Sequence, residues 1–216
     1  MPQTAASTEP PMAAPRKRGG GKARIIAAAV DQFAEHGFDG TSTVEIAKAA
    51  KVSQSVVLYH FATKEELWQE AMRTLFQSVD ASAIFRNEIY ADLSIVDRFN
   101  IMLRQFVITS ARHPQVGKII LREGLSGGLR LEWLLGELIM PQYEAFFLLI
   151  RKLVEEGKIQ PVDPVVATLA IHGAGATLFN LHHLSERLMG KKPDWDEIAE
   201  AQADLLVRVF TKGLLV

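Results

Sequence analysis

A run of polar side chains near the start of the chain has the residue types that contact nucleic acid. Gln54 and Ser55 stand at the beginning of a short helix predicted over 54–61, where side chains can meet base edges in the major groove. A glutamine amide can bond adenine bidentately, and a serine hydroxyl tolerates different bases. Other side chains in this run suit phosphates, through a hydroxyl, an imidazole, an ammonium or a helix N-terminus: Thr43, Lys48, Tyr59, His60 and Lys64. The pattern predicts a DNA-binding surface in which Gln54 and Ser55 read sequence and the other five set affinity and register.

Side chains able to perform catalysis are not arranged for it. The chain has no cysteine, no phosphate-binding glycine loop, no H-E-x-x-H pair and no nucleophile elbow. Ser126 lies beside two glycines, but no predicted strand precedes it to present an activated nucleophile. We therefore expect no enzyme activity and no cofactor.

The histidines do not form a metal site in this prediction. His172 and His183 share a predicted helix, but eleven residues place them about 16 Å apart along its axis, too far to share one ion. His182 and His183 are adjacent and are expected to point in different directions. No metal is expected.

Three helix starts position the polar run. Ser42 and Glu45 have the spacing of a capping box, in which each side chain bonds the other residue's backbone amide. Ser53 is a good N-cap for the next helix, and Thr63 with Glu66 repeats the capping-box spacing before a long helix. Two short helices around a tight turn, followed by a capped third helix, are typical of a helix-turn-helix.

These residues resemble the TetR family of one-component transcriptional regulators. The similarity covers residues 22 to about 68, while the remainder matches the family in length and helical character. The resemblance implies an operator-binding protein that most often represses transcription until a small molecule releases it. Its marks are Phe33, Gly37-Phe38, Thr43, Ile46-Ala47, Ala50, Val52-Ser53, Tyr59-His60-Phe61, Lys64 and Leu67.

Two positions depart from the family pattern. Lys51 stands in the turn where the family commonly has glycine, so a residue with a side chain is expected to take a strained or left-handed conformation. Leu58 stands where the family often has a tyrosine, with the aromatic residues shifted to Tyr59 and His60.

Charge is distributed unevenly along a chain that is nearly neutral overall. The 216 residues are 48% hydrophobic, enough for a substantial core, and the formal net charge is −1. Residues 16–64 carry +4, whereas residues 65–216 carry −4. A basic head can attract phosphates while an acidic body disfavours wrong orientations. No segment looks apolar enough to cross a bilayer and none resembles a secretory signal, so a cytoplasmic location is expected.

The predicted organisation is all-α, with about nine helices in a small head and a larger body. Residues 1–20 are expected to be a disordered arm, 21–66 the helix-turn-helix domain, and 67–216 the ligand-binding and dimerisation domain. The arm ends in the basic cluster 16–18, which either enters a minor groove or is a solvated tail.

The last two predicted helices, at about 164–188 and 194–212, have apolar faces that need partners. The first is apolar or small nearly all round, and its glycines and alanines indicate close helix approach or room for a ligand. Together they predict a four-helix interface between two copies of the chain. A twofold dimer also suits two DNA half-sites.

The body has aromatic residues suited to a mostly apolar pocket. His172 lies within the apolar helix and needs a hydrogen-bond partner, which could be a ligand, a water or another side chain. The predicted lining is Phe106, Trp133, Tyr143, Phe147, His172 and Phe179. The sequence thus predicts a homodimeric, TetR-like regulator of palindromic DNA that is released by a small, largely apolar effector. The alternative is a helical adaptor that binds only proteins.

Overall fold

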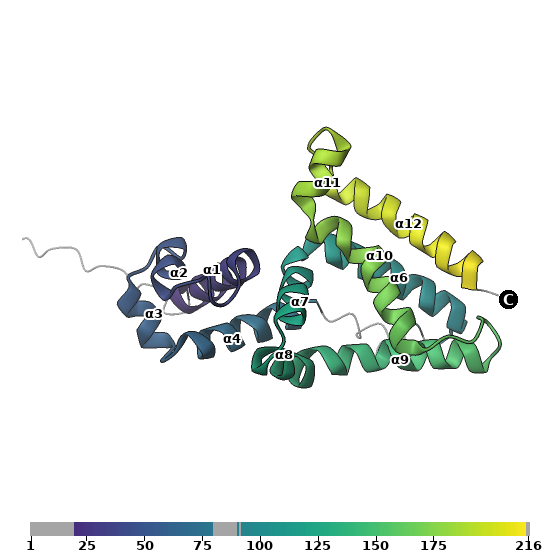
Figure 1. The fold of residues 1–216 in the computed structure, drawn as a ribbon, viewed down its shortest axis with the longest axis horizontal. Helices are drawn as coiled ribbons and strands as arrows, with labels where there is room; N and C mark the ends of the chain where they lie inside the picture. Colours follow the sequence, from purple (N-terminus) through teal and green to yellow (C-terminus); the bar gives the residue numbers. More distant parts are fainter. Residues whose placement is uncertain (1–19, 80–89, 91, 215–216) are drawn as a thin grey trace, which may run out of the picture.

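The computed structural model describes residues 20–79, 90 and 92–214, the last four as backbone only, and over these ranges it contains helices and no strands. The expected all-α class is confirmed. Figure 1 places a small head of three helices to one side of a larger body, with α4 leading from one to the other. The basic cluster 16–18 lies outside the described residues, so its expected DNA contact stays a prediction.

The helix starts predicted in the head are present. The head helices and the helix that follows them are α1 (Gly20–His36), α2 (Thr43–Ala49), α3 (Gln54–His60) and α4 (Lys64–Gln77). The capping box before α2 is complete, because Ser42 Oγ accepts from the Glu45 amide at 3.2 Å and Glu45 Oε2 accepts from the Ser42 amide at 2.9 Å. The Ser42 hydroxyl also donates to Glu45 Oε2 at 2.9 Å, and this bond, together with the one from the Ser42 amide, lowers the pKa of Glu45. Thr63 caps α4 by accepting from the Glu66 amide at 3.0 Å.

The turn between α2 and α3 has the backbone conformation that the sequence suggested. Lys51 has φ of 55°, and it is the only described residue other than glycine with positive φ. This left-handed conformation costs a residue with a side chain about 1–2 kcal/mol. Its amide donates to Lys48 O at 3.1 Å, and the Val52 amide donates to Ala47 O at 3.0 Å, so the corner is fixed by backbone bonds.

The body contains more helical segments than expected. They are α6 (Ile95–Arg112), α7 (Pro114–Ser126), α8 (Leu129–Leu134), the π-helical turn η2 (Leu135–Ile139), α9 (Met140–Glu155), α10 (Pro164–Asn180), α11 (His182–Met189) and α12 (Trp195–Leu214). The single helix expected over 164–188 is wrong, because the chain bends by 73° between α10 and α11. At the bend the Ser185 hydroxyl donates to Leu178 O at 2.7 Å, which satisfies a carbonyl near the end of α10.

The statement that no segment is apolar enough to cross a bilayer is also wrong by length and composition. Helices α8 and α9 join through η2 into one stretch, Leu129–Glu155, that is long and apolar enough. Some of its apolar side chains lie in the protein's own cores, however, since Leu134 and Ile139 are buried toward the head and Ile150 and Leu153 toward the body, while Leu129 and Leu148 are exposed. A buried helix of a folded domain has the same composition as a membrane span.

Two hydrophobic cores divide the described chain. The first core joins the head to its neighbours: α1, α2, α3 and α4 bury their apolar faces together with Ile119 of α7 and residues of α8 and η2. The second core lies within the body, among α6, α9, α10 and α12. Figure 1 shows α12 running alongside α6. The first core therefore crosses the predicted domain boundary at residue 66, and the division into domains stays a prediction.

Candidate DNA-binding surface and ligand cavity

Helix α3 turns its polar start outward. Gln54 and Ser55 are exposed at its first turn, and Tyr59 near its end has 84% of its surface accessible. Val57 is fully buried on the opposite side and anchors α3 in the first core. The helix thus presents to solvent the residues that the sequence assigned to DNA.

Hydrogen bonds organise this surface across the turn. Gln54 Nε2 donates to Thr43 Oγ1 at 3.3 Å, so the start of α3 is tied to the start of α2. The Ser53 and Ser55 hydroxyls lie 2.8 Å apart, and Ser53 is the N-cap of α3 without a side-chain bond to a backbone amide of the helix. Gln54 keeps its amide oxygen for another donor. These contacts hold Gln54 and Thr43 together on one face.

The side chains predicted to contact phosphates around α3 differ in exposure and in whether they already bond to other groups of the head. Lys48 is exposed on α2, and His60 is partly buried with its ring 5.2 Å from that of Tyr59. Lys64 is engaged inside the head: its ammonium donates to Phe38 O at 2.9 Å and Thr41 O at 3.0 Å. The same ammonium lies 4.2 Å from the centroid of the Phe38 ring. Two of its three ammonium protons are used in hydrogen bonds within the head, so Lys64 primarily stabilises the loop before α2.

A cavity of about 430 Å³ lies in the body where five helices and η2 meet. One wall comes from Phe76 at the end of α4, from Val79 just after it, and from Val116 and Ile120 of α7. The remaining walls come from α6, η2, α9 and α10. We refer to this space as the body cavity.

Three of the six predicted lining residues reach the body cavity, namely Phe106, Tyr143 and His172. The other three do not line it, since each packs elsewhere. Trp133 lies against the first core, with its ring 5.4 Å from that of Trp68. Phe179 is buried, with its ring centroid 6.1 Å from that of Trp195. Phe147 packs against the Tyr143 ring but does not line the cavity.

His172 has a side chain as its partner, which was one of the options left open. Its Nδ1 lies 3.1 Å from the hydroxyl oxygen of Tyr143. Burial lowers the pKa of His172 to about 4 and raises the pKa of Tyr143 to about 12, so both are neutral near pH 7. The Phe106 ring lies 4.5 Å from that of His172. The pair is a polar group set in an apolar wall.

Asn180 is a lining residue that the sequence reasoning missed. Its Oδ1 is buried and has no hydrogen-bond partner among the described residues. The carboxamide lies over Gly117 of α7, where a Cβ would come within 2.2 Å of Oδ1. The available signal was an amide side chain as the last residue of a mostly apolar helix.

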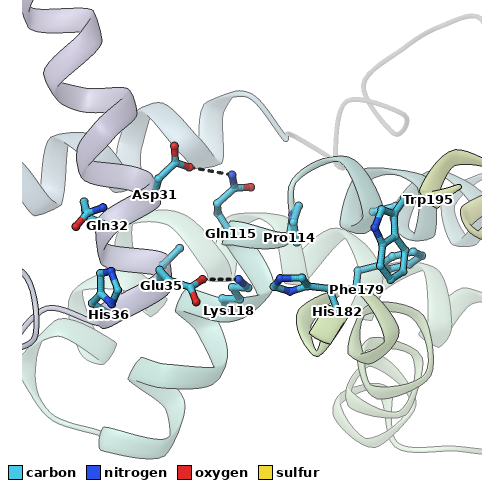
Figure 2. A pocket seen from close by; sticks show the side chains of 12 residues that line it. Asp31, Gln32, Glu35, His36, Pro114, Gln115, Lys118, Phe179, His182 and Trp195 are labelled. Atoms are coloured by element: carbon cyan, nitrogen blue, oxygen red, sulfur yellow. Dashed lines mark hydrogen bonds and ion pairs between the residues drawn. The ribbon is translucent and has the colours of Figure 1, made fainter. Parts of the chain in front are cut away.

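A second cavity of about 420 Å³ separates the head from the body. Figure 2 shows Asp31 and Glu35 of α1 on one side, with His182, Phe179 and Trp195 on the other. Helix α7 bridges the two, because Lys118 Nζ donates to Glu35 Oε2 at 2.8 Å and Gln115 Nε2 donates to Asp31 Oδ1 at 3.1 Å (Figure 2). The bond with Lys118 lowers the pKa of Glu35.

The orientation of His182 and His183 differs from the expected one. The rings of His182 and His183 lie 3.9 Å apart, so the prediction that they point in different directions is wrong. The residues lie at the start of α11 just after the bend, which the prediction of one long helix did not include. Within the described ranges, no three side chains of histidine, aspartate or glutamate gather as ligands for a metal ion.

Comparison with known proteins assigns the family. Residues 25–71 match the model described as bacterial regulatory proteins of the tetR family. The chain is 32% identical over 146 residues to the HTH-type transcriptional regulator RutR of Escherichia coli K12, an alignment that covers 66% of each chain and so just under two thirds of RutR. It is 30% identical over 74 residues to the icaADBC HTH-type negative transcriptional regulator IcaR of Staphylococcus aureus, which is 34% of this chain and 39% of IcaR.

Solved structures share this fold over most of the chain. A tetR-family regulatory protein from Rhodococcus RHA1 superposes with a TM-score of 0.66 at 26% identity, over 87% of this chain and 95% of that one. AibR, solved with isovaleryl coenzyme A and operator DNA, superposes with a TM-score of 0.68 at 21% identity, over 87% and 96%. With its helix-turn-helix, its helical body and these relatives, the chain belongs to the TetR family of transcriptional regulators.

Proposed function

We propose that this protein is a homodimeric, cytoplasmic repressor that binds a palindromic operator through α3 and is released by a small, largely apolar effector in the body cavity. The observation that carries the proposal is the position of α7. One side of α7 contributes Val116 and Ile120 to the body cavity, and its other side holds α1 of the head through Lys118 and Gln115. A ligand pressing on α7 therefore acts on the element that supports the DNA-reading helices.

The head has the chemistry for DNA. Helix α3 carries no acidic residue, and its exposed start offers an amide and a hydroxyl to base edges. Lys48 and Lys51 lie exposed on the same helix-turn-helix, where ammonium groups can neutralise phosphates. AibR, described in complex with operator DNA, supports this partner class, and the name of IcaR supports negative regulation.

The outer faces of α10 and α12 support dimerisation. Gln202 of α12 donates to Ala174 O of α10 at 2.6 Å, so the two helices are joined. Large apolar side chains remain exposed along them: Val165, Val166, Leu169, Leu205 and Val209. Apolar patches of this kind on a single chain mark protein contacts. A second copy is the partner that two half-sites on DNA require.

Release by an effector requires a second position of α7, in which its contacts with α1 are changed. In the described state α7 is fixed to α1, and Arg122 also donates to Ala34 O at 3.2 Å. A ligand that favours a different position of α7 shifts the two heads and lowers DNA affinity without unfolding. Such coupling is commonly about 1–3 kcal/mol, or 5- to 150-fold in affinity.

The DNA surface is tested with two substitutions that separate reading from affinity. Gln54→Ala should relax the base preference at one position of the operator, at a cost of about 1–3 kcal/mol on the preferred sequence. Lys48→Ala should weaken binding to all duplexes and reduce the salt slope by about 1. Lys64→Ala is less informative, because it also removes two bonds inside the head.

The control is Lys152→Ala, which removes the same charge from an exposed position on α9. Operators are selected from random duplexes, and binding is then measured by fluorescence anisotropy across salt concentrations, with ultracentrifugation giving the subunit number. Equal effects of Gln54→Ala and Lys48→Ala would refute the division of roles. A protein that binds no duplex in dilute buffer, or stays monomeric at micromolar concentration, would refute the proposed function.

A further inference from the structure

The described lining of the body cavity has no permanently charged side chain. Aspartate, glutamate, lysine and arginine are all missing from it, and the ionisable residues are Tyr143, His113 and His172. Burying a carboxylate or an ammonium without an opposite charge is strongly unfavourable. A charged ligand would therefore be strongly disfavoured in this cavity.

The Tyr143–His172 pair leaves one proton to offer. If the Tyr143 hydroxyl donates to Nδ1, the neutral imidazole carries its proton on Nε2; if Nδ1 donates to the hydroxyl oxygen, the hydroxyl proton is unused. In both arrangements the pair keeps one donor that is not used between the two residues. A ligand at this end needs an acceptor oxygen or nitrogen.

Asn180 presents the opposite requirement. Its Oδ1 is buried and without a partner among the described residues, and leaving a buried acceptor unpaired is unfavourable. The other neutral polar side chains of the lining differ from Asn180. Ser110 donates to Phe106 O at 2.8 Å, Thr177 is exposed to water, and Thr109 and Gln142 have no buried polar atom without a partner among the described residues. Asn180 is the buried group that a ligand donor would satisfy.

The two polar positions are separated along one helix. Both His172 and Asn180 belong to α10, and eight residues correspond to about 12 Å of helix rise. Ala176 lies between them, and Phe106, Val116 and Ile120 make the facing surface apolar. The space between the polar positions therefore suits hydrocarbon.

We propose that the body cavity binds an elongated, uncharged molecule with an apolar middle, whose hydroxyl or N–H group at one end donates to Asn180 and whose acceptor at the other end meets the Tyr143–His172 pair. This inference rests on the proposed function only in taking the cavity as the effector site. The ligand class it names is a neutral diol, diamide or hydroxy-amide, and it excludes carboxylates and amines.

The test uses three probes of equal chain length with the intact protein. They are octanediol with a hydroxyl at each end, its dimethyl ether, which keeps the acceptors and has no donor, and octanedioate, which is charged. Calorimetry and thermal shift, without DNA, should show the diol binding about 5- to 150-fold more tightly than the ether, and no binding of octanedioate at the same concentration.

Variants locate the two ends. Asn180→Leu should remove the preference for the diol over the ether, and the double variant Tyr143→Phe/His172→Leu, which removes both possible donors of the pair, should weaken the diol and the ether alike. Tyr59→Phe, which removes the same hydroxyl from exposed α3, should leave both unchanged. If Asn180→Leu does not fold, the probe comparison on the natural sequence still decides the matter.

Several results would overturn the inference: no binding of the diol, an ether that binds as well as the diol, octanedioate binding as well as either, or a diol preference that survives Asn180→Leu. DNA release is measured separately. A diol that binds without releasing operator DNA supports the ligand class and contradicts the proposed regulation, whereas release by a carboxylate effector in the body cavity does the reverse.

Discussion

Two glycines on α10 should respond to alanine in opposite directions. A Cβ on Gly175 would lie 2.6 Å from Cε1 and 3.0 Å from Cδ1 of Phe106, whereas a Cβ on Gly173 would meet nothing within 4 Å. The Phe106 ring cannot turn away freely, because it is buried against His172 at 4.5 Å and Phe146 at 6.4 Å between centroids. The Phe106 ring therefore occupies the space that a side chain at position 175 would need.

The quantity to compare is the difference in unfolding free energy between the two alanine variants, because the gain in helix propensity is the same in both and cancels. Each alanine gains about 1 kcal/mol relative to glycine in a helix interior, and overpacking at Gly175 costs about 1–3 kcal/mol. Gly173→Ala should raise the free energy of unfolding by up to about 1 kcal/mol, and Gly175→Ala should be less stable than Gly173→Ala by about 1–3 kcal/mol. Gly175→Ala should also weaken ligand binding, since Phe106 lines the body cavity.

Urea unfolding followed by circular dichroism at one fixed protein concentration measures both variants. Gly124→Ala on α7, where a Cβ also meets nothing within 4 Å, controls for any effect of Gly173 on association. Equal stabilities of the Gly173 and Gly175 variants would refute the steric reasoning.

Two further predictions concern the turn and the buried histidine. Lys51→Gly should stabilise the protein by about 0.5–1 kcal/mol, because removing the left-handed strain gains more than the added entropy of the unfolded chain costs. As a control, Lys48→Gly within α2 should destabilise the protein by up to about 1 kcal/mol. A loss of stability in Lys51→Gly, measured by urea unfolding, would contradict this prediction. Because the folded pKa of His172 is about 4 and its ordinary value is 6.5, the unfolded chain binds more protons between these values. Stability should therefore be fully present above pH 6.5 and fall by at most about 3 kcal/mol toward pH 4. His172→Gln should show a shallower decline over this window in thermal unfolding, and parallel curves for the two proteins would count against burial of the histidine.

The local structure of the head could be read from the sequence because its causes are local. Ser42 and Thr63 accept from amides three residues ahead, so the spacing of residues is enough to identify where α2 and α4 begin. The left-handed Lys51 follows from a turn position where glycine is the usual residue. Asp163 before Pro164 likewise caps α10, accepting from the Val165 amide at 2.9 Å.

Tertiary packing decided what spacing could not express. Aromatic residues at helical intervals identified core positions, but only the crossing of helices sends Trp133 to the first core and Tyr143 to the body cavity. Lys64 has the composition of a phosphate contact, yet the carbonyls of Phe38 and Thr41 lie more than twenty residues away in sequence and come near only in the fold. The bend after Asn180 has no glycine or proline to announce it. Residue type and short-range bonding therefore determined the helix-turn-helix, while contacts between distant segments determined the shape of the cavity and which polar groups face it.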